Sequence, residues 1–337
     1  MNSDLILLGH GSGGILSHQL LEELLIPTLS GEGLSKRNDA ALLDLAGQRL
    51  VFTTDSYVVD PIFFPGGCIG DLAVNGTVND LAMMGATPLW LSCGMIIEEG
   101  FSRSELALVA AAMRESADRA GVRIVTGDTK VVPRGKADKL FINTSGVGTV
   151  DHDLRIDGTR ASPGDRIIVS GTIGDHGIAV LASREGLDLE SGVRSDCAPL
   201  NGLVAQLIAA GGEAVHVLRD PTRGGIATTI KEIALQSGVD IVLDETGLPL
   251  SSGVRAVCAI LGLDPLYVAN EGKLLAFVAP EQAEELLAVV RSHPLGGDAA
   301  IIGEVVGTGS GKVRMRTSVG GFRGVEMLAG ELLPRIC

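Results

Sequence analysis

Four aspartates in the first half of the chain could together hold a metal ion. Each stands where an expected strand or helix ends and a polar turn begins, and they are Asp39, Asp55, Asp80 and Asp128. Ligands in α/β folds gather at such positions, and carboxylates that gather there repel one another unless a cation neutralises them. Oxygen-only ligands favour magnesium or calcium over zinc. The alternative for each single acid is that it caps the next helix; for the four together we expect a metal site.

A glycine-rich segment near the N-terminus could surround a phosphate group. It reads Gly9-His10-Gly11-Ser12-Gly13-Gly14, follows the apolar run 5–8, which is read as a short strand or lead-in, and precedes a helix expected from Ser17. The glycines satisfy the GxGxxG pattern, but a dinucleotide fold also needs a second buried parallel strand. Residues 31–44 look instead like a loop that bears acids. The glycine-rich backbone could still surround an anion such as phosphate. The alternative, which the sequence leaves open, is a flexible loop without a ligand.

The familiar P-loop for ATP is absent from the sequence. Each Gly-Lys pair, at 135–136, 272–273 and 311–312, is followed by Ala, Leu or Val rather than by Ser or Thr. In a P-loop that hydroxyl binds magnesium. Any ATP that the protein uses must therefore be held by another phosphate cradle.

The last residue, Cys337, carries a thiol that a tail could move between sites. The lead Gly320-Gly321-Phe322-Arg323-Gly324 is flexible, and an extended tail of this length reaches tens of ångströms at about 3.3 Å per residue. Pro334 favours an extended conformation before it, so the terminus should form a strand-like finger. The α-carboxylate disfavours the thiolate and Arg335 partly offsets this effect, so we expect a thiol that is unreactive until it docks.

Composition limits the class of protein and its partners. With 337 residues, 45% of them hydrophobic, the chain can build two cores. A net charge of −14 argues against nucleic acid and anionic membranes as partners, since both need a basic face. Five cysteines without a CxxC pair argue against a disulfide framework and favour a cytoplasmic location. The N-terminal apolar run has no basic flank, so we expect no signal peptide, and no run has the length of a membrane span.

Apolar periodicity divides the chain into two α/β halves. The first half is expected to hold strands at 50–54, 88–97, 123–126 and 140–150, with one helix ending near Asp80 and another from Ser102 to Gly121. After a turn-rich linker, the second half is expected to hold strands at 166–170, 214–218, 239–243, 273–279 and 299–306 and helices at 177–184, 200–210, 226–237, 252–261 and 281–291. The expected domains are 1–155 and 156–318, followed by a flexible tail, 319–337.

Several motifs make the chain resemble the HypE family of hydrogenase maturation factors. They are Asp55-Ser56-Tyr57-Val58-Val59-Asp60-Pro61, Phe63-Phe64-Pro65-Gly66-Gly67, Asn79-Asp80-Leu81-Ala82-Met83-Met84-Gly85-Ala86, Gly127-Asp128-Thr129-Lys130, Asp220-Pro221-Thr222-Arg223-Gly224-Gly225 and Pro334-Arg335-Ile336-Cys337. The resemblance covers the whole chain. Several motifs are shared with aminoimidazole ribonucleotide synthetase, selenophosphate synthetase and thiamine monophosphate kinase, whereas the terminal cysteine is not. Asn38 departs from the acidic pair that these families often carry, which leaves the number of metal ions open.

The resemblance implies a fold and an activity. The fold is an α/β (α+β) homodimer in which the mixed sheets of two N-terminal domains form a barrel, each followed by a C-terminal α/β domain. HypE-like proteins receive a carbamoyl group on the terminal thiol from a HypF-like carbamoyltransferase. They dehydrate it with ATP to a thiocyanate and pass the cyanide to iron on a HypC–HypD complex, for [NiFe]-hydrogenase. Phosphorylation converts the carbamoyl oxygen into a good leaving group, and loss of an N–H proton then gives the nitrile.

The resemblance also implies a role for each candidate residue. The four aspartates should hold Mg²⁺ and, through it, the triphosphate of ATP. The nucleotide-binding set further includes Gly11, Ser12, Gly13, Gly14 and Thr129. Cys337 should carry the substrate, Glu271 is the preferred base, and Lys130 should clamp the transferred phosphoryl group or remove a proton.

Two other functions stay open at this stage. A superfamily kinase or synthetase could phosphorylate a free small molecule, in which case the tail would be incidental. A non-catalytic carrier protein could use its acids only for structure. Loss of turnover when Cys337 is removed would separate the first alternative from the dehydratase, and magnesium-dependent ATP hydrolysis would exclude the carrier.

Overall fold

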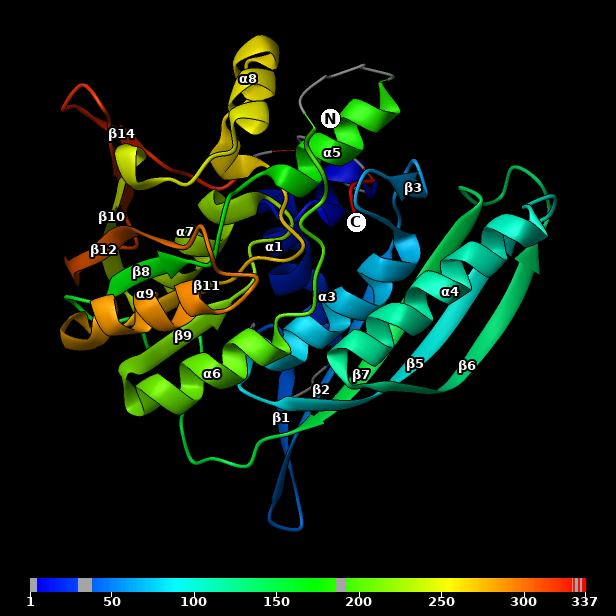
Figure 1. The fold of residues 1–337 in the computed structure, drawn as a ribbon, viewed down its shortest axis with the longest axis horizontal. Helices are drawn as coiled ribbons and strands as arrows, with labels where there is room; N and C mark the ends of the chain where they lie inside the picture. The colour runs from blue at the N-terminus through cyan, green and yellow to red at the C-terminus, as the bar shows by residue number, and fades with distance from the viewer. Residues whose placement is uncertain (1–4, 30–37, 186–191, 329, 331–332, 334) are drawn as a thin grey trace.

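The computed structural model describes residues 5–29, 38–185, 192–328, 330, 333 and 335–337, which form two β-sheets and the helices that cover them (Figure 1). A five-stranded sheet belongs to the first half of the chain and a seven-stranded sheet to the second. A small hairpin pairs β3 (Phe63–Phe64) with β4 (Gly67–Cys68). The predicted α/β fold with a mixed N-terminal sheet is confirmed.

The first sheet has the order β1-β2-β7-β5-β6. Its strands are β1 (Ala41–Leu45), β2 (Gln48–Tyr57), β5 (Thr87–Glu98), β6 (Arg123–Val132) and β7 (Leu140–Thr149). β5 and β6 run parallel, and the other neighbouring strands run antiparallel. β6 is therefore an edge strand, and nine of its ten residues are exposed.

The two faces of the first sheet have different surroundings. Alternate residues of β7 are buried, because they face α3 (Ile69–Met83) and α4 (Arg103–Ala120), which lie along that face (Figure 1). The described part of the chain leaves much of the opposite face open, and Phe52, Trp90 and Ile96 are 43%, 44% and 42% exposed there. We call this surface the bare face.

The second sheet has the order β14-β13-β10-β12-β8-β11-β9 and lies between two layers of helices. Its strands are β8 (Arg166–Val169), β9 (Val215–Arg219), β10 (Val239–Asp244), β11 (Leu275–Val278), β12 (Ala300–Thr308), β13 (Val313–Arg316) and β14 (Phe322–Gly324). α7 (Gly225–Ser237) packs on one face, and α6 (Asn201–Gly211) and α9 (Ala283–Ser292) pack on the other. α5 (Asp175–Arg184) and α8 (Ser252–Leu261) pack together through Ile178, Val254 and Val257.

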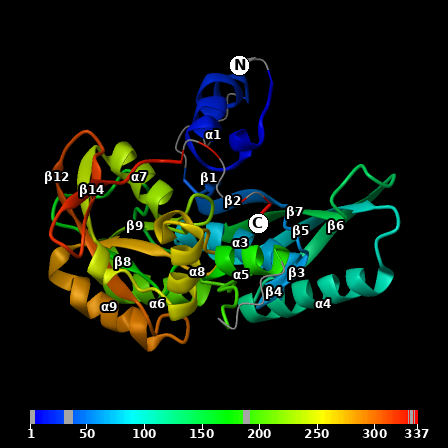
Figure 2. The same cartoon turned by 90° about the horizontal axis from the view of Figure 1, so that it is seen from above.

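The N-terminal segment stands apart from both sheets in the view of Figure 2. It consists of the 3-10 turn η1 (Leu8–Gly11), α1 (Ile15–Leu20), the π-helical turn η2 (Leu21–Leu25) and α2 (Ile26–Leu29). Among the described residues of the second half, further 3-10 turns lie at Gly212–Ala214, Glu245–Gly247, Pro265–Tyr267 and Pro280–Gln282.

α3 connects the two halves. Cys68 caps its N-terminus, since its thiol accepts a hydrogen bond from the N–H of Gly70, and Asp71 accepts one from the N–H of Cys68. Near its other end, Asn79 donates to the carbonyls of Ala198 and Glu271, at 3.1 and 3.2 Å, and accepts from the N–H of Leu200 at 2.8 Å. One buried amide thus ties the first half to two loops of the second.

Most predicted elements are confirmed within a few residues, and the differences are informative. Residues 5–8 form no strand, since η1 begins at Leu8. Part of the expected acidic loop is the strand β1, which pairs with β2, whereas residues 30–37 lie outside the described part. β6 continues to Val132 because it pairs with β5 along its length, so Asp128 lies within a strand and not at its end.

The tail also differs from the expected flexible segment. β14 extends the second sheet, and Ile336 forms an antiparallel bridge with Val59, as expected of a strand-like finger. Pro334 lies outside the described residues. Within the described part of the chain, no helix is both long and apolar enough to cross a membrane.

Replacing Asn79 with alanine should destabilise the contact between the two halves. The substitution leaves two buried carbonyls and one buried N–H without their partner, so we expect the free energy of unfolding to fall by about 2–4 kcal/mol. Urea denaturation measures this change. The exposed Gln282, whose side chain makes no cap hydrogen bond at the start of α9, provides a control, since Gln282→Ala should change stability by less than about 0.5 kcal/mol. Equal stability of the two variants would contradict this role of Asn79.

Candidate active site

A polar cavity of about 260 Å³ lies where the two halves meet. β2 contributes Thr53 and Asp55, and α3 contributes Asp80. The end of β9 contributes Arg219, and the loop that follows contributes Asp220, Thr222 and Arg223. Asp39, Glu271 and the last residue, Cys337, also line the cavity. Segments distant in the sequence therefore converge on one small space.

Three carboxylates in this cavity form a candidate metal site. One oxygen each of Asp39, Asp80 and Asp220 can be chosen so that all three lie within 4.8 Å of one another. Thr53 holds two of these segments together, since its hydroxyl lies 2.8 Å from Oδ2 of Asp80 and 3.1 Å from the carbonyl of Asp39. Asp55 lines the same cavity. The structure thus brings three of the four predicted aspartates together and adds Asp220.

Burial raises the pKa of each carboxyl in this cluster. The pKa of Asp39 rises to about 8 and that of Asp220 to about 6, because burial disfavours the charged form more than Arg219 stabilises it. Burial and the charges of Asp220, Asp55 and Asp39 raise the pKa of Asp80 as well. Such a cluster holds protons unless a cation replaces them.

Arg219 supplies part of the compensating positive charge. Its Nε lies 2.8 Å from Oδ1 of Asp39, and its Nη2 lies 3.0 Å from Oε2 of Glu232. Glu232 also contacts Nε2 of His18 at 2.8 Å, which ties α1 to the cavity. Oδ2 of Asp39 is buried and has no hydrogen-bond partner among the described residues. An oxygen-rich cluster with a spare buried oxygen fits a hard cation such as Mg²⁺.

The thiol of Cys337 and the carboxyl of Glu271 line the same cavity. Glu271 is 3% exposed, and its Oε1 has no hydrogen-bond partner within the described residues. Burial, Asp196 and Asp220 raise the pKa of Glu271 well above the ordinary value. Burial and Glu271 likewise raise the pKa of Cys337, whereas Arg223 lowers it. The docked position therefore disfavours the thiolate, in contrast to the activation expected on docking.

Arg335 does not assist the thiol as expected. Its guanidinium contacts Asp138 at 2.8 Å and Asp60 at 3.7 Å, both outside the cavity lining. The positive charge near Cys337 comes instead from Arg223, which lines both this cavity and an adjoining one. The proximity of Cys337 is the largest cause that raises the pKa of Arg223.

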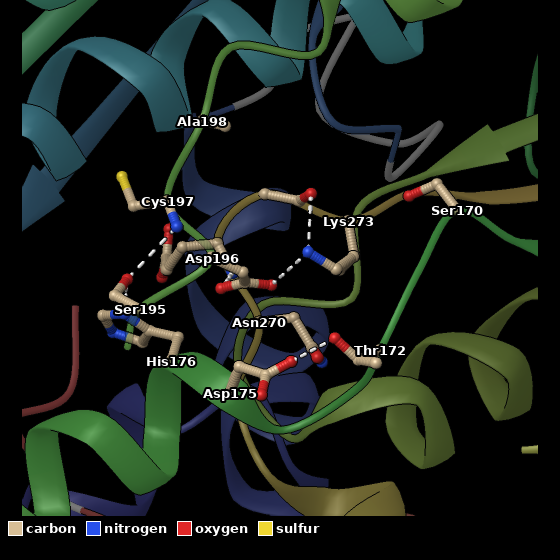
Figure 3. A network of polar contacts seen from close by, with 12 residues as sticks. Ser170, Thr172, Asp175, His176, Ser195, Asp196, Cys197, Ala198, Asn270 and Lys273 are labelled. Carbon is tan, nitrogen blue, oxygen red and sulfur yellow. Dashed lines mark hydrogen bonds and ion pairs between the residues drawn. The ribbon is translucent and has the colours of Figure 1, made fainter. Parts of the chain in front are cut away.

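Asp196, Asn270 and Lys273 belong to one polar network (Figure 3). This network also holds the backbone of Glu271. Asp196 accepts the N–H of Glu271 at 3.1 Å, and its other oxygen pairs with Lys273 at 3.2 Å. Asn270 accepts the N–H of Gly174 and donates to the carbonyl of Pro221, each within 2.9 Å. The loop that carries Glu271 is therefore held against the turn that carries Asp220.

The glycine-rich loop borders the adjoining cavity, which has a volume of about 290 Å³ and is lined by Gly11, Ser12 and Cys337 among others. Gly13 has φ +77° and packs against Arg223, and a Cβ at Gly14 would overlap the carbonyl of Leu328. Ser17 accepts the N–H of Gly13 at 2.9 Å. The loop is thus held beside the terminal thiol, as a phosphate cradle would need to be, although its ligand stays a prediction.

Asp128, Thr129 and Lys130 lie elsewhere in the single chain. The strand register places Asp128 and Lys130 on the bare face, and β6 lies three strands from β2, about 14 Å away. Lys130 and Asp128 pair at 3.3 Å and both are exposed. One chain therefore does not bring these residues to the cluster, because β6 lies at the far edge of the sheet from β2.

Some residues of the site were not singled out from the sequence. Asp220 follows an expected strand and begins a polar turn, which is the same signal that selected the other aspartates. Arg219 and Glu232 gave no signal, because a cation and an acid on separate elements meet only in the fold. His176 and Asp196 likewise lie in segments without a recognisable motif.

Comparison with known proteins assigns both halves of the chain to one family. Residues 37–150 match the N-terminal domain, and residues 162–316 the C-terminal domain, of AIR synthase related proteins. The curated protein carbamoyl dehydratase HypE of Bradyrhizobium diazoefficiens is 53% identical over 330 residues, which are 98% of this chain and 95% of that protein.

Two solved structures are similar over nearly the whole chain. A crystal structure of the hydrogenase maturation protein HypE in complex with ATP is 52% identical, with a TM-score of 0.83, and the match covers 99% of this chain and 100% of that one. A crystal structure of a HypE–HypF complex is 47% identical, with a TM-score of 0.87, and the match covers 92% and 99% of the two chains.

Magnesium binding to the aspartate cluster should depend on pH. The carboxyls of Asp39 and Asp220 keep their protons until the pH passes about 8 and about 6, so a metal ion must displace these protons. The apparent affinity should therefore rise between pH 6 and pH 8, by up to about tenfold per pH unit for each proton displaced. Titration calorimetry in buffers of different ionisation enthalpy measures the affinity and the protons released.

Two variants complete this test. Asp80→Asn should weaken magnesium binding, whereas the exposed Asp151→Asn should leave it unchanged. An affinity that does not change with pH, or that survives Asp80→Asn, would contradict a metal site at this cluster.

Proposed function

Since this chain belongs to the HypE carbamoyl dehydratases of the AIR synthase related family, we propose that it uses ATP to convert a carbamoyl group on Cys337 into a nitrile. The product is a thiocyanate that supplies the cyanide ligand of the [NiFe]-hydrogenase iron. The observation that carries this proposal is the position of Cys337, which shares one cavity with the buried carboxyl of Glu271 and with the aspartate cluster.

ATP and magnesium have suitable partners in this cavity. A similar HypE structure is a complex with ATP, which supports the same nucleotide here. Asp39, Asp80 and Asp220 would hold Mg²⁺, with Asp55 at the same cavity wall. When bound, Mg²⁺ neutralises the charge that builds up on the phosphates during transfer. The loop from Gly11 to Gly14 would close over the phosphates.

The first chemical step is phosphoryl transfer to the carbamoyl oxygen. That oxygen attacks the γ-phosphorus of ATP, ADP leaves, and one N–H proton is lost, so that the carbon is joined to sulfur, an imine nitrogen and a phosphorylated oxygen. Arg223 lies among the negative charges of Asp55, Glu271 and Asp80 and retains its own charge, so it suits an electrostatic role toward the phosphoryl group.

The second step is elimination of phosphate. The remaining N–H proton passes to a base, the nitrogen electron pair forms the third C–N bond, and the C–O bond breaks to release phosphate. Glu271 is the better base within one chain, because it lines the cavity with Cys337 and a raised pKa makes its carboxylate more basic. Lys130 projects from the bare face and would need another way into the site.

A second copy of the chain would bring Lys130 to a cavity, namely that of the partner chain. β6 is an exposed edge strand beside the bare face, and both features are typical of surfaces that pair with another sheet. We therefore propose a homodimer in which the sheets of two chains form a barrel. Asp128, Thr129 and Lys130 would then serve the cavity of the partner chain.

The carbamoyl donor is proposed to be a HypF-like carbamoyltransferase. A similar HypE structure is a complex with HypF. The docked thiol of Cys337 is partly buried, and burial disfavours its thiolate by raising its pKa, which suits neither nucleophilic attack nor access by another enzyme. Loading would therefore take place with the tail released, and the nitrile would later pass to iron on a HypC–HypD complex.

The alternatives explain less of this site. A kinase that acts on a free small molecule does not need a terminal thiol beside the base. A carrier protein does not need a cluster of three half-buried carboxylates, of which Asp39 and Asp220 have pKa values above the ordinary value. Both alternatives remain outcomes of the experiments that follow.

Deleting Cys337 should abolish both modified forms of the chain. Intact-mass spectra after incubation with carbamoyl phosphate, the HypF-like partner and ATP should show a carbamoyl adduct and then its dehydrated form on the full chain, and neither on the truncated one. Nucleotide binding and the folded state should persist. Cys258→Ser, at a buried thiol of the second half, provides the control and should be modified normally. A dehydrated adduct on the truncated chain would contradict the proposal.

Glu271→Gln should stop the second step but not the loading. The variant keeps the size of the side chain and loses the base, so we expect it to accept the carbamoyl group and to form the nitrile at least about a hundredfold more slowly. In the wild type, single-turnover dehydration should rise with pH, since only the deprotonated Glu271 is a base and its pKa is raised. Lys130→Met tests the other candidate, and a loss confined to that variant would show that Glu271 is not the base.

A further inference from the structure

The last three residues are held by main-chain hydrogen bonds to the segment after β2. The N–H of Val58 donates to the carbonyl of Cys337 at 2.9 Å, and the N–H of Asp60 donates to the carbonyl of Arg335 at 3.2 Å. Val59 and Ile336 face each other across this short bridge. In such a pairing the carbonyl of the middle residue points away from the partner strand, so Ile336 needs another donor.

His176 is that donor. Its imidazole is fully buried, and Nε2 lies 2.7 Å from the carbonyl oxygen of Ile336. A carbonyl can only accept, so Nε2 carries the hydrogen and Nδ1 must accept a hydrogen bond. The hydroxyl of Ser195 lies 2.8 Å from Nδ1 and is oriented by the N–H of Cys197, which donates to its oxygen at 3.1 Å (Figure 3). Ser195 thus selects the tautomer that can bind the tail.

The imidazole has little freedom to leave this position. The ring of Phe64 packs against its edge, with centroids 5.4 Å apart and planes at 88°. Burial lowers the pKa of His176, which favours the neutral ring that this arrangement requires. Arg184, at the other end of α5, donates from Nε to the carbonyl of Asp60 and from Nη2 to the carbonyl of Arg335, both at 2.7 Å. α5 therefore binds the tail at two points, through His176 and Arg184.

We propose that His176 is a positioning residue, which binds the carbonyl of Ile336 and thereby holds the sulfur of Cys337 beside Glu271. Releasing the tail leaves the buried Nε2 of His176 without its acceptor, and this cost favours the docked tail. The hydrogen bond would therefore set the ratio of the docked tail to the released tail. The docked state suits dehydration, and the released state suits loading; this second part of the inference rests on the proposed function.

The docked fraction can be measured without any enzyme assay. Iodoacetamide alkylates the released thiolate of the full-length chain, and the terminal peptide left by cleavage after Glu331 reports on Cys337 alone. His176→Ala should raise the alkylation rate about tenfold, as expected from the loss of one buried hydrogen bond. Ser195→Ala, a milder change, should raise the rate less, because the ring loses the group that selects its tautomer.

Two further variants show whether the effect is specific. His176→Gln keeps an N–H near the place of Nε2 and should restore slow alkylation. His152→Ala removes a histidine that contacts a different backbone carbonyl, that of Gly85 at 3.0 Å, and should leave the rate unchanged. If His176→Ala alkylates no faster than His152→Ala, or if His176→Gln fails to restore protection, the inference is wrong.

The half-reactions test the second part. With protein carbamoylated in advance, His176→Ala should lower the single-turnover rate of dehydration about tenfold, while loading by the HypF-like partner stays equal or becomes faster. A purely structural defect would slow both. Faster alkylation in a protein that never forms a nitrile would uphold the positioning role and refute the proposed function, whereas unchanged alkylation together with normal nitrile formation would do the reverse.

Discussion

Negative charge enclosed by protein is the constraint on which this structure depends. Asp39, Asp80, Asp220 and Glu271 stand around a small cavity, and burial raises the pKa of each. A carboxylate removed from water is costly unless a cation or a proton accompanies it. Arg219 and Arg223 compensate only part of this charge, since the raised pKa values persist in their presence. The cavity is thus prepared for a divalent ion and resists any other anion that arrives without one.

Holding these groups close together requires elements from the whole chain. α3 brings Asp80 from the first half and, through Asn79, fixes the backbone of Glu271 in the second. Asp196 and Lys273 then hold the same loop from the other side. Because the hydrogen bonds of Asn79 cross between the two halves, the geometry of the site depends on how the halves pack together. A shift of either sheet would move the base away from the thiol.

The sequence predicts the elements of this fold well and the site in part. Glycine and proline mark the turns, and the apolar period distinguishes strands from helices, so most bounds agree within a few residues. Asp39, Asp55 and Asp80 were found because each ends an element beside a polar turn. Asp128 was placed at a strand end because Gly127 looked like a stop, whereas β5 offers pairing partners as far as Val132. Local signals cannot show how long a neighbouring strand will continue.

The contacts of the tail could not be predicted from the sequence. The sequence predicts a flexible lead to Cys337, but it does not predict that His176 and Arg184 contact the tail. Those contacts depend on the position of α5, which is set by packing against α8 and not by any motif. The same limit applies to the pKa of Cys337, since the acid that raises it comes from another element.

The bare face of the first sheet has one practical consequence. The chain contains a single tryptophan, and Trp90 is 44% exposed on this face and does not line the polar cavity. Its indole fluorescence therefore reports on whatever covers that face and on little else. Emission should shift to shorter wavelength as water is excluded from the ring, so dilution of the protein gives an optical signal for assembly without any label.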